Sequence, residues 1–190
     1  FRSYLCGRIA TEWLIEMKKS TKFIHDFIFY AVAGIYVFVL IAALFLKATS
    51  LKSVNLIPFQ FVADYFIEGQ PLALSNVVGN VALFIPMGIY LTVLNVKQPR
   101  MMNLLWIVLF STLVEVSQYI LSVGVTDIDD LLLNSIGGFL GICCGWGLQK
   151  LFRERTRYAV EVLSLVAGCA FLTLYFCLYF GVFGFRILII

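Results

Sequence analysis

Residues 127–150 read DIDDLLLNSIGGFLGICCGWGLQK, and this stretch sets the fold class of the chain. It opens on three aspartates and continues through about 20 mostly apolar residues, the length that one helix needs to cross a bilayer. Glycines recur at every fourth position, at Gly137, Gly141 and Gly145. Because overlapping GxxxG units let another helix approach closely, the stretch predicts a membrane-spanning helix that packs through these glycines.

The rest of the chain has the same apolar character. Of its 190 residues 62% are apolar and 13% are charged, whereas a soluble domain is about a quarter charged. Besides 131–150, long apolar stretches cover residues 24–46, 73–96, 102–122 and 158–184. We therefore predict an all-α, polytopic membrane helix bundle of about five transmembrane helices. The composition argues against nucleic acid as a partner, and the single histidine and five cysteines lack the spacing of a metal site.

Two segments flank the main membrane domain, which is predicted at residues 23–150. Residues 1–22 are predicted to form an amphipathic helix at the cytoplasmic interface. Its apolar residues recur at every fourth position, at Leu5, Ile9, Trp13 and Met17. Residues 151–190 are predicted to form a basic cytoplasmic loop and an aromatic-rich C-terminal transmembrane helix, whose aromatic surface suits contact with lipid or with a second copy of the chain.

The distribution of basic residues predicts the orientation. With a cytoplasmic N-terminus, 11 of the 14 lysines and arginines fall in cytoplasmic segments, and only Lys47, Lys52 and Arg186 fall outside. This asymmetry follows the positive-inside rule. The chain is therefore expected to be a multi-pass membrane protein with a cytoplasmic N-terminus and an extracytoplasmic C-terminus.

Polar side chains inside the apolar stretches mark the candidate site, because each costs free energy in hydrocarbon unless it faces protein or water. In the predicted orientation they all lie near the extracytoplasmic side and are expected to converge on one polar pocket. They are Asn76 and Asn80 in the second stretch, Glu115 and Gln118 in the third, and Asp127, Asp130 and Asn134 in the fourth. An alternative is structural: the aspartates cap a helix, and the other residues hydrogen-bond the helices together.

Four motifs in this order resemble the VanZ-like family of bacterial membrane proteins, over roughly residues 30–150. They are VNLIPF at 54–59, NVVGNVALFIPMG at 76–88, EVSQ at 115–118 and DIDDLLLNSIGG at 127–138. The resemblance implies a location in the bacterial cell membrane and reduced susceptibility to teicoplanin, a lipid-tailed glycopeptide antibiotic. Carried over by position, the family's polar motif residues here are Asn55, Asn80, Glu115, Gln118, Asp127, Asp130 and Asn134. Many members have an arginine shortly before the acidic run, where this chain has residues 123–126, VGVT.

Two kinds of function fit these residues. The first is a non-catalytic protein whose outer-leaflet pocket binds an amphiphile, either the lipid-tailed glycopeptide or a cell-wall lipid precursor. The second is a membrane-embedded enzyme that acts on a lipid headgroup through Glu115, Asp127 and Asp130. These carboxylates would divide acid and base roles or bind a divalent cation through oxygen ligands. No cofactor is required by the sequence, and a small transporter is disfavoured because no inverted repeat is visible.

The predicted orientation is testable by cysteine labelling in a variant that lacks the native cysteines. A membrane-impermeant thiol reagent added to whole cells should modify cysteines placed at positions 64 and 126, because both lie in extracytoplasmic loops. Cysteines at positions 98 and 155 should react only after the cells are permeabilised. Labelling of position 98 in intact cells would contradict the orientation and remove the basis for an outer pocket.

Overall fold

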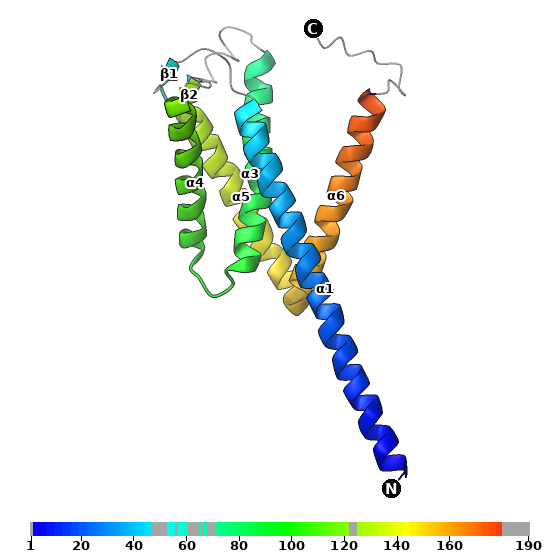
Figure 1. Cartoon of the computed structure of the whole chain (residues 1–190). Coiled ribbons are helices and arrows are strands. Elements are labelled where there is room, and N and C mark those ends of the chain that lie inside the picture. Colours follow the sequence, from blue (N-terminus) through cyan, green and yellow to red (C-terminus); the bar gives the residue numbers. More distant parts are fainter. Residues whose placement is uncertain are drawn as a thin grey trace. The chain divides into compact units, whose positions relative to one another are not determined.

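The computed structural model describes residues 2–46, 53–55, 57–60, 65, 67, 71–121 and 125–179. Within these residues the chain is helical apart from two three-residue strands and the turns between the elements. The elements are α1 (Arg2–Leu46), β1 (Ser53–Asn55), α3 (Pro71–Leu94), α4 (Arg100–Leu121), β2 (Val125–Asp127), α5 (Ile128–Phe152), the 3-10 turn η1 (Arg153–Arg155) and α6 (Thr156–Tyr179) (Figure 1). The all-α prediction is confirmed.

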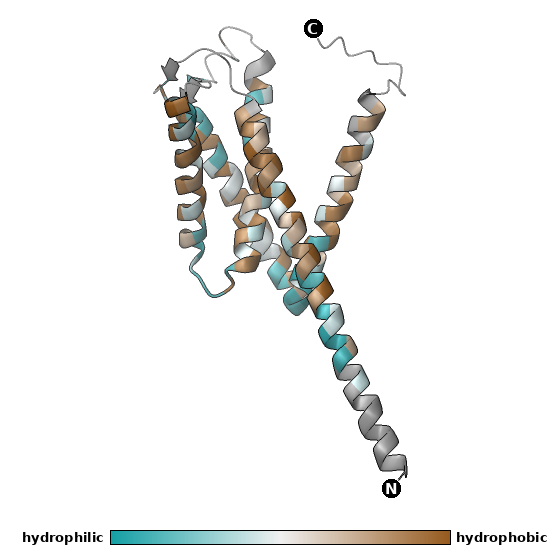
Figure 2. Ribbon diagram, in the orientation of Figure 1, coloured by the Kyte–Doolittle hydropathy of each residue, from teal (hydrophilic) through white to brown (hydrophobic). Residues whose placement is uncertain are grey.

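Four stretches are long and apolar enough to cross a membrane: Glu16–Phe45, Leu74–Leu94, Arg100–Leu121 and Ile128–Thr173. The last has 46 residues and joins α5 and α6, which have 25 and 24 residues and each exceed the length of about 20 that one crossing needs. The chain leaves the α-helical conformation between them, at Arg153, where φ is 49°. Brown, apolar residues dominate these helices, and teal, polar residues gather at the turn between α3 and α4 (Figure 2). The prediction of a polytopic membrane protein is confirmed.

The N-terminal segment is helical and continuous with the first apolar stretch. α1 runs without a break from Arg2 to Leu46, and its membrane-length portion starts at Glu16. The location of residues 1–22 at an interface and the domain boundaries at 22 and 150 stay predictions. The last residues of the predicted C-terminal helix, 180–184, lie outside the described residues.

The chain forms two compact units, Phe1–Gly34 with Arg157–Ile190, and Ile35–Thr156. In the first unit polar and aromatic groups connect α1 to α6. The imidazole Nδ1 of His25 lies 3.1 Å from a carboxylate oxygen of Glu161, and its ring meets that of Tyr158 edge-on. Arg157 lies 3.4 Å from a carboxylate oxygen of Asp26. His25 thus pairs with a carboxylate 136 positions away in the sequence.

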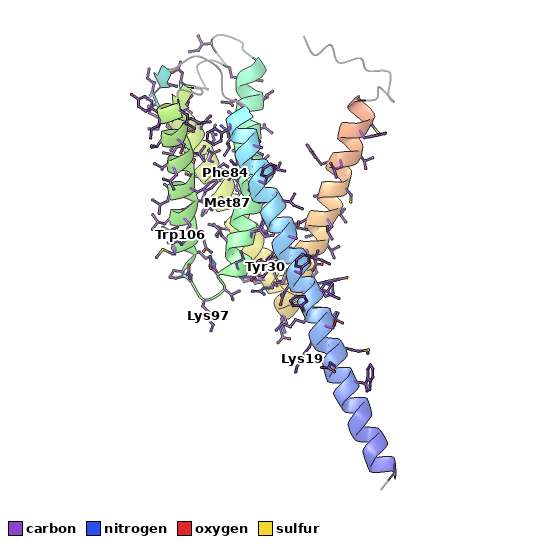
Figure 3. All side chains as sticks on the ribbon, in the orientation of Figure 1. Lys19, Tyr30, Phe84, Met87, Lys97 and Trp106 are labelled. Carbon is purple, nitrogen blue, oxygen red and sulfur yellow. The ribbon has the colours of Figure 1, made fainter. Side chains whose placement is uncertain are left out.

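The second unit holds the main apolar core. Its buried side chains come from α1, α3, α4 and α5, and they are Leu40, Leu44, Phe84, Ile107, Val114 and Ile142. Figure 3 labels Phe84 on α3, together with its partly buried neighbour Met87. The hydroxyl of Tyr36 in α1 donates a hydrogen bond of 2.7 Å to the backbone carbonyl of Leu83 in α3. Burial of these side chains ties the second half of α1 to α3.

Glycines bring α3 and α5 into direct backbone contact. A Cβ atom added at Gly137 or at Gly141 would collide with a backbone carbonyl of α3, that of Val81 or of Ile85. On α3, a Cβ at Gly88 would collide with the backbone of α5. The helices run in the same direction, because successive residues of α3 face successive residues of α5: Asn80 and Asp130, Val81 and Gly137, Ile85 and Gly141, Thr92 and Gly145.

A short parallel strand pair precedes these parallel helices. β1 lies before α3 and β2 lies directly before α5, and they pair in the register Ser53 with Val125, Val54 with Thr126, and Asn55 with Asp127. The sequence did not predict strands here. The pairing brings the segment before α3 to the N-terminal end of α5, where the predicted site residues Asp127 and Asp130 lie.

Replacing Gly141 by Ala tests the backbone contact. The added methyl group meets a carbonyl that cannot move away alone, so we expect α3 and α5 to separate and the free energy of unfolding to fall by about 1–3 kcal/mol. The measurement is the midpoint of thermal unfolding in detergent. Gly147→Ala is the matched control on the same helix, because nothing lies within 4 Å of its added Cβ. Equal stability of both variants would contradict the close contact.

Candidate functional site

The candidate site starts at the first turn of α5. Asp127 is the N-cap of this helix, and its side chain accepts a hydrogen bond of 2.9 Å from the backbone N–H of Asp129. Asp129 and Asp130 follow in the first turn. Negative charge is favourable there because unpaired backbone N–H groups and the helix dipole make a helix N-terminus positive. Together with Glu115 of α4, these three aspartates form what we call the acidic cluster.

Helix α3 contributes two amides to the acidic cluster. Asn76 donates a hydrogen bond of 3.2 Å from Nδ2 to Oδ1 of Asp130, and Nδ2 of Asn80 donates to the same oxygen. The two asparagines are four residues apart and therefore share one face of α3. Asn80 is buried, with 2% of its surface exposed. Asp130 of α5 is thus bound to α3, the same helix that the glycines of α5 contact.

Helix α4 and strand β1 meet at Asp127. A carboxylate oxygen of Glu115 accepts a hydrogen bond of 3.2 Å from the backbone N–H of Asp127, and Glu115 is buried. Nδ2 of Asn55 donates to Oδ1 of Asp127 at the same distance. Asn55 and Asp127 are also partners in the strand register. The strand pair therefore places an amide from the segment before α3 against the cap of α5.

Asp129 is a site residue that the sequence analysis did not select. It is 2% exposed, and its Oδ1 accepts a hydrogen bond of 2.6 Å from the backbone N–H of Phe59. Phe59 has a φ of 64°, in the left-handed region that a bulky side chain rarely adopts. Asp129 was missed because spacings of three and four residues predict Asp127, Asp130 and Asn134 on one helix face, and Asp129 lies on another. The sequence did contain a signal for Asp129. One aspartate is enough to cap a helix, and this helix begins with three, so the other two need a different explanation.

Two of the predicted ligand residues make their described contacts elsewhere. Gln118 donates from Nε2 to the backbone carbonyl of Leu44, at the end of α1, over 3.0 Å. Asn134 donates from Nδ2 to the hydroxyl of Ser111 over 2.9 Å, between α5 and α4. Its Oδ1 is buried and has no hydrogen-bond partner among the described residues. The other six, Asn55, Asn76, Asn80, Glu115, Asp127 and Asp130, lie in the hydrogen-bond network of the acidic cluster.

The sequence profile of the VanZ/LLP1 family matches residues 27–153, which include every residue of the acidic cluster. The chain belongs to the VanZ/LLP1 family. It is 33% identical over 92 residues to Protein VanZ of Enterococcus faecium, and the alignment covers 48% of this chain and 51% of that protein. The chain therefore spans about half the length of this curated relative. No solved structure matches the chain.

The partners described for the acidic cluster of this VanZ/LLP1 protein are hydrogen-bond donors. They are three backbone N–H groups and three asparagine amides. Among the described residues no three His, Cys, Asp or Glu side chains are grouped so that they could hold a metal ion. The arrangement is therefore that of carboxylates held by the donors of neighbouring segments.

Burial raises the pKa of Asp127 above its usual range. Hydrogen bonds from Asp129 and Asn55 oppose this shift, and the charges of Asp130 and Asp129 add to it. Loss of water disfavours the charged form of a carboxyl group, while donors that bind the charged form favour it. Asp127 therefore keeps its proton to a higher pH than an ordinary surface aspartate does.

Stability should reflect this titration. The folded-state pKa of Asp127 is raised, so ionised Asp127 costs stability at neutral pH, and the cost is relieved as pH falls toward about 4, the ordinary pKa of aspartate. Asp127→Asn is neutral at every pH and keeps an oxygen for the cap. The unfolding midpoint of the parent, minus that of this variant, should increase as pH is lowered from 7. A difference that stays constant would contradict the raised pKa.

Proposed function

We propose that this protein reduces susceptibility to a lipid-tailed glycopeptide by binding an amphiphile at the acidic cluster on the extracytoplasmic side of the membrane. The amphiphile is the antibiotic itself or a cell-wall lipid precursor. The observation that carries the proposal is that α3, β1 and the turn at Phe59 each donate hydrogen bonds to the aspartates at the start of α5, while Glu115 of α4 accepts one from Asp127. Membership of the VanZ/LLP1 family supports the link to glycopeptides.

The charge of the acidic cluster suits a headgroup that carries donors. Neighbouring carboxylates at a partly buried site repel one another, and each ionised group is easier to maintain when a cation or a hydrogen-bond donor meets it. An amine or hydroxyl group on the amphiphile would supply that donor. Asn134, one helical turn after Asp130, offers a buried acceptor oxygen for a further donor or a water molecule.

An apolar turn beside the acidic cluster suits the tail of the amphiphile. Ile57 and Phe59 are 65% and 60% exposed. Their backbone N–H groups donate to Asn55 and to Asp129, so the turn is fixed to the acidic cluster. Exposed apolar side chains next to carboxylates match a molecule with a polar head and an alkyl tail. In the predicted orientation both features face the outer leaflet.

A second candidate is an enzyme that acts on a lipid headgroup, and the raised pKa of Asp127 favours it. Neighbouring carboxyl groups can divide acid and base roles when the surroundings raise the pKa of one of them, as burial does for Asp127. In this case Asp127 would be the acid, and Glu115 or Asp130 the base, with or without a divalent cation. An enzyme would require each of these carboxylates individually, and a metal-dependent enzyme would also require the metal ion. A protein that only binds an amphiphile would not require a metal ion.

The test is antibiotic susceptibility of cells that express the full chain. We expect the parent to raise the inhibitory concentration of teicoplanin, and Glu115→Gln and Asp130→Asn each to remove the effect at unchanged protein level. A lost charge-assisted hydrogen bond weakens binding roughly tenfold or more. Glu154→Gln, on an exposed residue of η1 outside the acidic cluster, is the matched control and should protect like the parent. A glycopeptide without a lipid tail should show a smaller effect.

Each outcome selects between the proposals. If both isosteric variants protect as well as the parent, the carboxylate charge is not used, and the acidic cluster is a structural network only. If protection is lost and a chelator added to the parent reproduces the loss, the metal-dependent enzyme is favoured. Loss that a chelator does not reproduce favours amphiphile binding, and Asn76, Asn80 and Asn134 are then the next positions to replace.

A further inference from the structure

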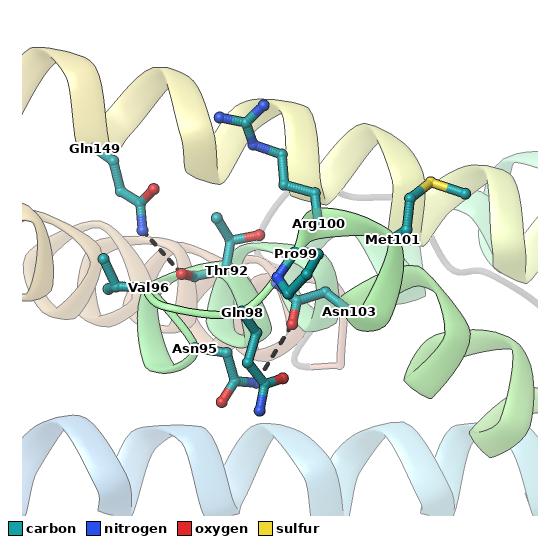
Figure 4. A pocket seen from close by; sticks show the side chains of 9 residues that line it. All are labelled: Thr92, Asn95, Val96, Gln98, Pro99, Arg100, Met101, Asn103 and Gln149. Carbon is teal, nitrogen blue, oxygen red and sulfur yellow. Dashed lines mark hydrogen bonds between the residues drawn. The ribbon is translucent and has the colours of Figure 1, made fainter.

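A cavity of about 340 Å³ lies at the other end of the second unit, away from the acidic cluster. Figure 4 shows the side chains that line it. The cavity is lined by the last turn of α3, the turn that leads into α4, the first residues of α4, and Gln149 near the end of α5. Its volume lies within the range of about 300–1,000 Å³ that is usual for small-molecule sites. The contacts of the acidic cluster do not involve it.

Amide side chains line the cavity, and two hydrogen bonds fix its walls. Asn103 is 1% exposed, and its Oδ1 accepts a bond of 3.4 Å from Nδ2 of Asn95. Gln149 donates from Nε2 to the backbone carbonyl of Thr92 over 2.8 Å, which joins α5 to α3. Figure 4 shows both bonds on the cavity wall. Gln98 is a further lining amide, and none of the described residues that line the cavity is acidic.

Positive charge is held at the edge of the cavity. Arg100 lines it and begins α4, whose N-terminal N–H groups add partial positive charge. The guanidinium carbon of Arg100 lies 4.5 Å from the ring centroid of Trp146, and Nζ of Lys150 lies 3.8 Å from the same centroid. Trp146 and Lys150 are four residues apart on α5, so the ring holds two cations near one another.

The lengths of α3 and α4 predict that the cavity lies at the depth of the lipid headgroups. α3 ends at Leu94 and α4 begins at Arg100, and both have the length and composition of membrane crossings. Val96 and Met101 also line the cavity, and they are 69% and 74% exposed, as suits contact with acyl chains. The positive-inside prediction assigns this end to the cytoplasmic leaflet, whose surface is negative.

We propose that this cavity binds the phosphate group of an anionic phospholipid. Arg100 and the N-terminus of α4 neutralise the phosphate charge, while Asn95, Gln98 and Asn103 supply amides for its oxygens and for a neighbouring headgroup hydroxyl. The acyl chains lie along Val96 and Met101. A soluble phosphate ester carries the same phosphate group and could bind the same polar residues. The exposed apolar residues at the rim favour the lipid, because only the lipid has acyl chains to contact them. The proposal does not depend on the function of the acidic cluster.

The experiment measures lipid binding to the full chain in a neutral detergent by native mass spectrometry. The probes are dioleoylphosphatidylglycerol, dioleoylphosphatidylcholine and glycerol 3-phosphate. We expect the parent to bind phosphatidylglycerol more tightly than the other two. Arg100→Gln should weaken that binding about tenfold, the effect of removing one strong charge-assisted bond. Gln98→Glu should weaken phosphatidylglycerol binding similarly, because the new carboxylate in the cavity repels the negatively charged phosphate.

Lys97→Gln is the matched control. Lys97 is exposed on the same turn, does not line the cavity, and carries the same charge as Arg100 (Figure 3). It should change phosphatidylglycerol binding by less than about twofold, as expected for a charge outside the site. Equal weakening by Lys97→Gln and Arg100→Gln would overturn the site in favour of a general surface charge. Binding of glycerol 3-phosphate that depends on Arg100, without binding of phosphatidylglycerol, would overturn the lipid in favour of a soluble phosphate ester.

Discussion

The contact between the backbones of α3 and α5 is the constraint on which the second unit depends. Gly88, Gly137 and Gly141 remove the side chains that would hold the helices apart. Because the helices are parallel, the same contact aligns two polar regions at their opposite ends. Near the start of both helices Asn80 reaches Asp130, and near their ends Gln149 reaches the backbone carbonyl of Thr92. A change in the glycine contacts would therefore disturb the acidic cluster and the cavity together.

The acidic cluster shows how a membrane helix can begin with several carboxylates. Such groups are costly near hydrocarbon unless donors meet them. Here the donors come from segments that are distant in sequence: the backbone of the turn at Phe59, the amide of Asn55 and the asparagines of α3. The same bonds hold the turn with its exposed Ile57 and Phe59 beside the carboxylates. The turn that donates a hydrogen bond to the carboxylates therefore also exposes the apolar side chains next to them.

The sequence predicts the features of the fold that repeat along the chain, such as apolar stretches and shared helix faces. It does not predict contacts between irregular segments that are far apart in the sequence. Apolar length gives the membrane helices, and spacing places Asn76 with Asn80 and Asp127 with Asp130 on common faces. The pairing of β1 with β2 involves three residues in each strand and has no periodic signature. The bond from Phe59 to Asp129 depends on a single backbone angle in a turn. The cavity was also missed, because it forms where a turn meets the end of α5, away from the polar residues that were predicted to converge on one pocket.

The charges at the two ends of this unit also compensate the helix dipoles. Two parallel helices in contact align their dipoles unfavourably, with both positive ends together and both negative ends together. In this chain Asp129 and Asp130 occupy the first turn of α5, and Lys150 occupies its last turn. α4 does not receive the same compensation, because its N-terminus carries Arg100 and has no acidic residue in its first turn. Arg100 and Lys150 leave positive side-chain charge beside a cavity lined with amides, and an anion bound there would balance that charge.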